Sequence, residues 1–107
     1  MDERDIGNIF VVGFHGTRLA SDLREFLEEL RPSGVILFSR NIGDPIQLAE
    51  LNRDLQVHAR QWTDDGLLIG VDQEGGRVRR LKEPFSVFPC AMELARSDRP
   101  EIGRAHV

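Results

Sequence analysis

The sequence predicts an α/β fold with a parallel sheet, on three observations. Short apolar runs begin near residues 9, 35 and 67, and each run has the length of one buried strand. The segments between the runs carry the apolar periodicity of amphipathic helices. The spacing of the runs suits strands that alternate with helices, and such crossover connections produce parallel strands. We therefore expect βα units in series along the chain.

The first expected unit is a strand at Ile9–Phe14 followed by a helix. Its strand consists of β-branched and aromatic residues closed by glycines, which is typical of a strand buried on both faces. Apolar residues at i, i+3, i+4 and i+7 then predict the buried stripe of a helix. Those residues are Leu23, Phe26, Leu27 and Leu30. We expect Ser21 to cap this helix and Pro32 to end it.

The second expected unit is a strand at Val35–Phe38 with a longer helix after it. Asp44-Pro45 predicts a helix start, because the aspartate can accept hydrogen bonds from the unpaired backbone amides of the first turn and proline suits the first helical position. Gln47 is expected to reach back to the cap, and the helix is expected to run to about Trp62. Its predicted buried stripe is Leu48, Leu51, Leu55, Ala59 and Trp62.

A third strand is expected at Leu67–Val71, and it leads into the most distinctive stretch of the chain. This stretch reads D-Q-E-G-G-R-V-R-R-L at residues 72 to 81, with two acids, a glycine pair and three arginines. Polar groups at the carboxyl ends of parallel strands are where α/β enzymes meet their ligands. Residues 72 to 81 are therefore the predicted ligand-binding edge. A loop, a helical turn at Ala91–Ala95 and a new helix start at Asp98-Arg99-Pro100-Glu101 are expected to follow.

The predicted elements indicate a partial domain. Three parallel strands that are apolar on both faces need more cover than 107 residues provide. A helix that starts near residue 98 would also stop short of the roughly 12 residues at which helices become stable. We expect residues 1–107 to be the N-terminal portion, about three βα units, of a (β/α)8 barrel that is incomplete in this chain. The first and third strands should then have unpaired edges.

Composition excludes several functional classes. The 14 basic and 18 acidic residues are well mixed, with a net charge of −4, which argues against nucleic acid or an anionic membrane as the partner. No apolar run approaches the length of a membrane span, and the charged N-terminus is unlike a signal peptide, so a cytoplasmic location is expected. Cys90 is the only cysteine and has no metal-ligand spacing to a partner. Neither a metal nor a cofactor is expected.

Three stretches together resemble a known family. They are G-V-I-L-F-S-R-N-I at residues 34 to 42, D-P-I-Q-L at 44 to 48, and D-Q-E-G-G-R-V-R-R-L at 72 to 81. They resemble the N-terminal part of family 3 glycoside hydrolases, in particular the bacterial β-N-acetylhexosaminidases that act on peptidoglycan fragments. The resemblance implies a barrel enzyme that hydrolyses terminal N-acetyl-β-glucosaminides with retention, through a covalent glycosyl-enzyme intermediate.

The same resemblance implies roles for two residues. Asp72 matches an aspartate that binds sugar hydroxyls, and Arg80 matches an arginine that contacts the same sugar. A carboxylate accepts hydrogen bonds from two neighbouring hydroxyls, and a guanidinium donates two parallel hydrogen bonds in a fixed geometry. The family's nucleophile and its histidine acid/base belong to motifs that these 107 residues do not contain, so no catalytic residue is expected in this chain. From pattern alone, Asp72 could also be a turn or helix-cap aspartate.

Further residues are candidates for supporting roles. Glu74, Gly75, Gly76 and Arg77 are expected to shape the turn around the sugar, with Glu74 paired to Arg77 or Arg79. Arg40 and Asn41 could line the site, but support of their own loop is the favoured interpretation. The histidines, which are His15, His58 and His106, are expected at the surface.

Two alternatives stay open on the sequence. A family 3 β-glucosidase would share the sugar-binding aspartate, so this nearest alternative differs from a β-N-acetylhexosaminidase only in its substrate. A truncated, non-catalytic carbohydrate-binding piece would keep Asp72 and Arg80 without any turnover. Comparison of the hydrolysis of glucosides with that of N-acetylglucosaminides distinguishes a β-glucosidase from a β-N-acetylhexosaminidase. Sugar affinity without hydrolysis identifies the carbohydrate-binding piece.

Overall fold

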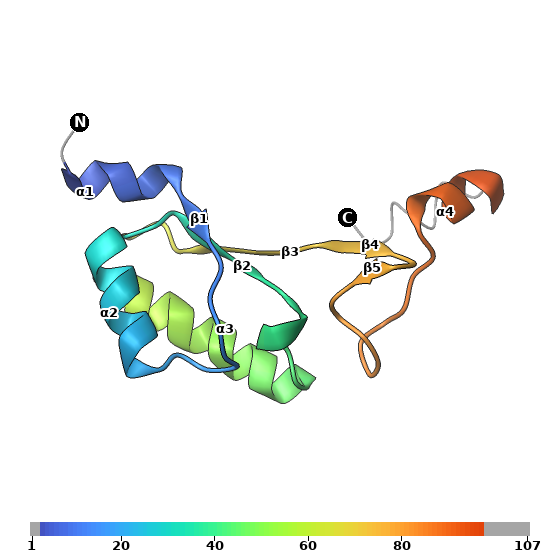
Figure 1. Ribbon diagram of the computed structural model, residues 1–107, viewed down its shortest axis with the longest axis horizontal. Helices are drawn as coiled ribbons and strands as arrows, with labels where there is room; N and C mark the ends of the chain where they lie inside the picture. The colour runs from blue at the N-terminus through green and yellow to red at the C-terminus, as the bar shows by residue number, and fades with distance from the viewer. Residues whose placement is uncertain (1–2, 98–107) are drawn as a thin grey trace. The chain divides into compact units, whose positions relative to one another are not determined.

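A parallel sheet of three strands forms the first part of the chain. The structure is a computed structural model that describes residues 3–97, and it divides into two compact units with their boundary between Val71 and Asp72. In the first unit the strands are β1 (Val11–Val12), β2 (Gly34–Leu37) and β3 (Leu68–Val71), in the order β1-β2-β3 (Figure 1). Both pairings are parallel, so the predicted sheet type and strand order are confirmed.

Two helices connect the three strands. Helix α2 (Ser21–Leu30) links β1 to β2, and α3 (Pro45–Ala59) links β2 to β3 (Figure 1). Val35 and Leu37, which share one face of β2, belong to the same buried cluster as residues from both helices. The two helices therefore cover the same face of the sheet, as expected for right-handed crossovers in series. Shorter elements are α1 (Glu3–Ile6) and the 3-10 helices η1 (Gly7–Ile9) and η2 (Ser39–Asn41).

The core lies between this sheet face and the helices. Its buried members are Phe14, Leu19, Leu23, Leu27, Val35, Leu37, Leu51, Leu55, Ala59 and Leu67. The predicted stripe of α3 is confirmed, with Leu48 and Trp62 half-buried against the core. In α2 the prediction fails at Phe26, which is 46% exposed. Phe26 lies at the margin of a narrow stripe centred on Leu23 and Leu27, so its ring stays in contact with solvent.

The helix ends agree only in part with the predicted caps. Asp44 caps α3 as predicted, with its Oδ1 accepting from the Gln47 backbone N–H at 2.9 Å. Gln47 reaches back one residue further than expected, because its Oε1 accepts from the Gly43 N–H at 2.7 Å. The prediction for Ser21 is wrong. The N-cap of α2 is Ala20, whose methyl side chain cannot accept a hydrogen bond. Helix α3 also ends at Ala59 rather than at Trp62.

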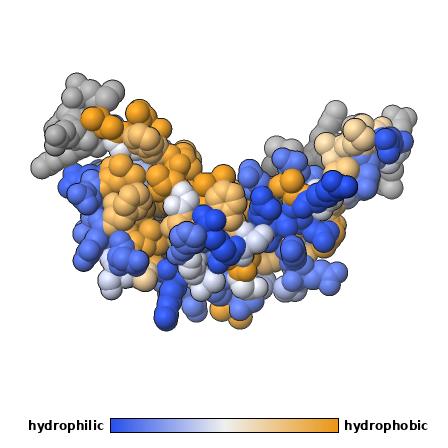
Figure 2. All heavy atoms as spheres, viewed as in Figure 1, coloured by the Kyte–Doolittle hydropathy of each residue, from blue (hydrophilic) through white to orange (hydrophobic). Residues whose placement is uncertain are grey.

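The outer strands are more exposed than their apolar runs predict. Val11 in β1 is 54% exposed and Leu68 in β3 is 67% exposed, whereas β2 is largely buried. Within the described residues the helices cover one sheet face only, so side chains on the opposite face meet solvent. Exposed apolar residues also gather around α1 and β1 (Figure 2); they include Ile6, Ile9, Phe10 and Val11.

The second unit begins with a hairpin that the sequence did not predict. Strands β4 (Gln73–Gly75) and β5 (Val78–Arg79) pair antiparallel, and helix α4 (Ala91–Ser97) follows a loop. Helix α4 extends two residues beyond the helical turn expected at Ala91–Ala95. The helix start expected at residues 98 to 101 lies outside the described residues, as does His106. Among the helices of residues 3–97, none has both the length and the apolar character needed to cross a membrane.

His58 contradicts the expectation of a surface histidine. It is 3% exposed, and its Nε2 lies 3.1 Å from the Arg24 carbonyl oxygen of α2. Because that oxygen can only accept, Nε2 carries the proton, and Nδ1 accepts from the Gln61 side-chain amide at 3.1 Å. The ring also meets Trp62 edge to face, with centroids 5.5 Å apart. His58 therefore links α3 to α2. His15 is exposed, as expected.

We predict that His58→Ala lowers the free energy of unfolding by about 3 kcal/mol, because it removes the bond to Arg24 and leaves a cavity beside Trp62. The matched control is His15→Ala at an exposed position, where a change within about 0.5 kcal/mol is expected. Urea unfolding followed by circular dichroism measures both variants. Equal effects at the two positions would contradict the assigned role of His58.

Candidate functional site

Asp72 and Arg80 lie directly beyond the outermost pair of the β4–β5 hairpin, one on each arm. Its register pairs Gln73 with Arg79, so the next residues outward on the two arms are Asp72 and Arg80. Asp72 directly follows the last residue of β3 and is exposed, while Arg80 is half-buried. The two residues predicted to bind a sugar therefore lie at the open end of the hairpin, one on each arm.

The glycine pair sets the path of the backbone at the closed end. Gly75 and Gly76 have φ values of +79° and +58°, in the region that glycine adopts most easily. Gly75 is also buried, and a Cβ there would lie 2.8 Å from the backbone N of Cys90 and the carbonyl oxygen of Phe88. A Cβ at Gly76 would meet only the Cys90 side chain, at 3.5 Å. Close approach to the 88–90 segment thus requires glycine at position 75.

Gln73 holds the second arm of the hairpin beyond the end of the strand. Its Oε1 accepts from the backbone N–H of Arg80 at 2.9 Å and from that of Leu81 at 3.0 Å. Its Nε2 donates to the Leu81 carbonyl oxygen at 3.2 Å. Sequence reasoning missed this residue, because a glutamine between two acids carries no strong signal. The available cue was that a carboxamide can both donate to and accept from a neighbouring backbone.

The predicted ion pair of Glu74 is wrong. Glu74 and Arg77 are both exposed, and the one ion pair between two formally charged side chains within residues 3–97 is Arg53–Asp54 at 3.3 Å, while the His58 ring, whose Nδ1 acts as an acceptor, lies 3.6 Å from Glu28. Exposed charges at the tip of a short hairpin gain little from pairing in water. The glycine turn, and not an ion pair, therefore sets the conformation of the hairpin tip.

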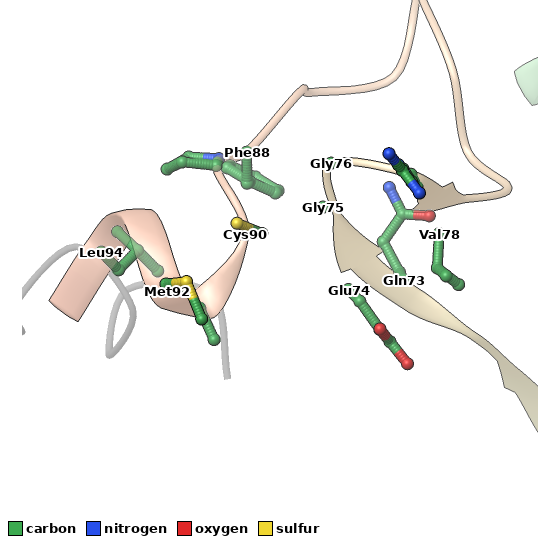
Figure 3. A pocket seen from close by; sticks show the side chains of 12 residues that line it. Gln73, Glu74, Gly75, Gly76, Val78, Phe88, Cys90, Met92 and Leu94 are labelled. Atoms are coloured by element: carbon green, nitrogen blue, oxygen red, sulfur yellow. The ribbon is translucent and has the colours of Figure 1, made fainter. Parts of the chain in front are cut away.

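A cavity of about 830 Å³ lies within the second unit, between the hairpin and the start of α4 (Figure 3). Its lining is mostly apolar and comprises residues 73–78, 88–92 and 94. In the close view, Cys90 and Met92 come from the side of α4 while Gln73 and Val78 come from the hairpin (Figure 3). Asp72 and Arg80 are absent from this lining, so the cavity is separate from the predicted sugar-binding pair.

Arg40 and Asn41 belong to the first unit and bind its backbone. Asn41 is fully buried, and its Nδ2 donates to the carbonyl oxygens of Phe14 at 3.1 Å and Gly16 at 2.8 Å. Its Oδ1 accepts from the Phe38 N–H at 2.9 Å. Arg40 donates from Nε to the Phe14 carbonyl at 2.9 Å, with its guanidinium carbon 4.9 Å from the centroid of the Phe38 ring. These contacts tie the segment after β1 to the end of β2.

The described residues offer no evident metal centre. Across residues 3–97, no group of three or more His, Cys, Asp or Glu side chains is placed to hold an ion.

Comparison with known proteins connects the chain to carbohydrate-active enzymes. Residues 1–105 match the profile described as glycosyl hydrolase family 3 N terminal domain. A curated beta-hexosaminidase of Vibrio cholerae is 45% identical over 83 residues, which are 78% of this chain and 24% of the relative. Another, from Alkalilimnicola ehrlichii, is 47% identical over 85 residues, 79% of this chain and 23% of the relative. The chain thus spans about a quarter of the length of these relatives.

Solved structures show the same relationship. A glycoside hydrolase family 3 beta-N-acetylglucosaminidase from Paenibacillus matches with a TM-score of 0.83 and 35% identity, covering 94% of this chain and 19% of that one. NagZ from Neisseria gonorrhoeae, in complex with N-trifluoroacetyl-D-glucosamine, matches with a TM-score of 0.71 and 28% identity. That match covers 89% of this chain and 27% of NagZ. The mixed α/β fold is consistent with a domain of the TIM-barrel type.

We predict that Gly75→Ala destabilises the hairpin by about 2 to 3 kcal/mol, because both the positive φ and the contact with the 88–90 backbone oppose a side chain. Gly76→Ala is the matched control, with an expected cost of about 1 kcal/mol from the backbone conformation alone. Amide hydrogen exchange of residues 73–79 measures the local stability. Equal loss of protection in both variants would contradict the role assigned to the contact at Gly75.

Proposed function

Because the chain belongs to glycoside hydrolase family 3, we propose that it supplies the N-terminal, sugar-binding part of a retaining β-N-acetylhexosaminidase. The substrates we propose are terminal N-acetyl-β-glucosaminides, including fragments of the bacterial cell wall. Curated relatives named beta-hexosaminidase and structural neighbours named beta-N-acetylglucosaminidase support this assignment. In this proposal, residues 1–107 are the N-terminal portion of a larger (β/α)8 domain.

The observation that carries the proposal is the register of the β4–β5 hairpin. The pairing ends at Gln73 and Arg79, so Asp72 and Arg80 are the next residues on the two arms at the hairpin's open end. In the proposed complex, the Asp72 carboxylate accepts hydrogen bonds from two adjacent sugar hydroxyls, while the Arg80 guanidinium donates to sugar oxygens. Together the two charges offer both acceptors and donors to one ring. A sugar hydroxyl needs both kinds of partner when it leaves water.

The role we propose for this segment is to hold the sugar and not to break the bond. Retaining hydrolysis needs a nucleophilic carboxylate and an acid/base group on either side of the glycosidic bond, and we assign neither to these 107 residues. The nucleophile displaces the leaving group to form a glycosyl-enzyme, which water then hydrolyses. Fixed contacts to the sugar ring contribute by orienting the anomeric carbon toward the attacking groups.

Neighbouring residues support the binding pair in this proposal. Gly75 and Gly76 allow the hairpin to turn, and Glu74 and Arg77 keep its tip solvated. In the first unit, Arg40 and Asn41 bind their own loop through the hydrogen bonds described above, so we assign them a structural role.

We predict a large kinetic effect of the binding pair in a chimera that carries residues 1–105 in place of the aligned part of the Vibrio cholerae beta-hexosaminidase. Asp72→Ala should lower kcat/KM for an aryl N-acetylglucosaminide about 100-fold, and Arg80→Ala about 10-fold or more, because each leaves sugar hydroxyls unpaired. Asp54→Ala and Arg53→Ala remove an exposed ion pair of the same charge types and serve as controls. An unaltered kcat/KM in Asp72→Ala would refute the assignment.

The same chimera separates the alternatives. Turnover of an aryl glucoside at least equal to that of the N-acetylglucosaminide would favour a β-glucosidase. Sugar binding without any turnover by the folded chimera would favour a carbohydrate-binding piece. The proposed function predicts hydrolysis with preference for the N-acetylated sugar.

A further inference from the structure

We propose that Gln73 is a positioning residue that fixes Arg80 for sugar binding. It acts through the backbone of Arg80 and not by contact with the sugar. This inference rests on the proposed function, because it takes Arg80 as a sugar ligand. The hydrogen bonds that carry it lie within the second unit and are independent of any ligand.

The geometry of the hairpin explains why Arg80 needs such support. The strand pairing ends with Gln73 opposite Arg79, so the Arg80 and Leu81 amides lie beyond the last paired residue. Both amides donate to one acceptor, the Oε1 of Gln73, at 2.9 and 3.0 Å. Nε2 of the same side chain donates to the Leu81 carbonyl at 3.2 Å, which fixes the orientation of the carboxamide. A single side chain therefore extends the pairing past its end.

The consequence for binding follows from the shortness of the hairpin. Two-stranded hairpins are marginal in water, and this one has an irregularity of register between Gln73 and Gly75. An arginine on a loose arm would lose both backbone and side-chain freedom when it binds a ligand. With its backbone N–H held by Gln73, Arg80 loses less backbone freedom when it binds a ligand. Loss of Gln73 should therefore weaken binding even though Gln73 itself contributes no contact to the sugar.

The chain contains a matched control for this interaction. Gln56 of α3 binds one backbone residue in the same two-sided way, with Oε1 accepting from the Leu67 N–H at 2.8 Å and Nε2 donating to the Leu67 carbonyl at 2.7 Å. Leu67 immediately precedes β3 in the first unit. Removal of Gln56 removes an equivalent pair of bonds without touching Arg80. It therefore separates a general loss of stability from a specific loss of positioning.

The test is a double-mutant cycle in the full chain, with N-acetylglucosamine titrated against ¹⁵N-labelled protein and its Kd read from chemical shifts. Gln73→Leu should raise Kd about 10-fold, and Arg80→Ala should raise it at least as much. The double variant should match Arg80→Ala alone, because Gln73 acts through Arg80. Gln56→Leu should leave Kd within about twofold of the wild type while lowering stability. Additive effects of Gln73→Leu and Arg80→Ala, or no effect of Gln73→Leu on Kd, would overturn the inference.

A second variant covers the case in which Gln73→Leu fails to fold. Gln73→Glu keeps the acceptor for the Arg80 and Leu81 amides and replaces the donor to the Leu81 carbonyl by a carboxylate oxygen, which rotates away from that carbonyl, so the variant should bind the sugar within about threefold of the wild type. Failure of Gln73→Glu to preserve binding would overturn the role of the Oε1 acceptor.

Amide exchange distinguishes this inference from the proposed function. Slow exchange of the Arg80 and Leu81 amides in the wild type, lost in Gln73→Leu and kept in Gln73→Glu, supports the positioning contact whether or not sugar binds. Absence of sugar binding by wild-type chain with those amides protected would count against the proposed function. Unprotected Arg80 and Leu81 amides in wild-type chain would overturn the positioning role itself.

Discussion

Backbone groups at the ends of short strands and in the loops that follow them need partners, and four carboxamide side chains provide them in this chain. Asn41 joins the ends of β1 and β2, Gln47 binds the carbonyls of Thr17 and Asn41, Gln56 holds the residue before β3, and Gln73 holds the residues after β5. A carboxamide is suited to this task because it donates and accepts at once and carries no charge to desolvate. The short strands of this fold depend on such contacts where their own pairing ends.

This constraint also connects structure to function. Strands β4 and β5 are only three and two residues long, and the proposed binding of one sugar ring by Asp72 and Arg80 requires a fixed separation of these two residues. The buried, positive-φ Gly75 fixes the closed end of the hairpin, and Gln73 fixes the open end. In the proposed function, these two contacts limit the conformational entropy that the hairpin loses on binding the sugar.

Much of the first unit could be predicted because its signals are local. Apolar periodicity located both helices, and Asp44-Pro45 identified the start of α3. The buried position of His58 was missed, although it lies seven residues after Leu51 on the same helical face, because histidine alone suggests a surface. The hairpin was missed because residues 74–77 were interpreted as a turn within a ligand-binding edge, and the close approach of residues 88–90 to Gly75 leaves no local signal in the sequence. Asp72 and Arg80 came from resemblance, since no local pattern marks a sugar ligand.

The central claim is that the hairpin after β3 binds the sugar, and a map of chemical-shift changes tests it most directly. The ¹⁵N-labelled chain is titrated with N-acetylglucosamine, and with glucose in parallel, while every backbone amide is followed. The account predicts saturable changes concentrated in residues 72–81, with tighter binding of N-acetylglucosamine than of glucose. Changes confined to other segments, or none within residues 72–81 at saturating sugar, would contradict it.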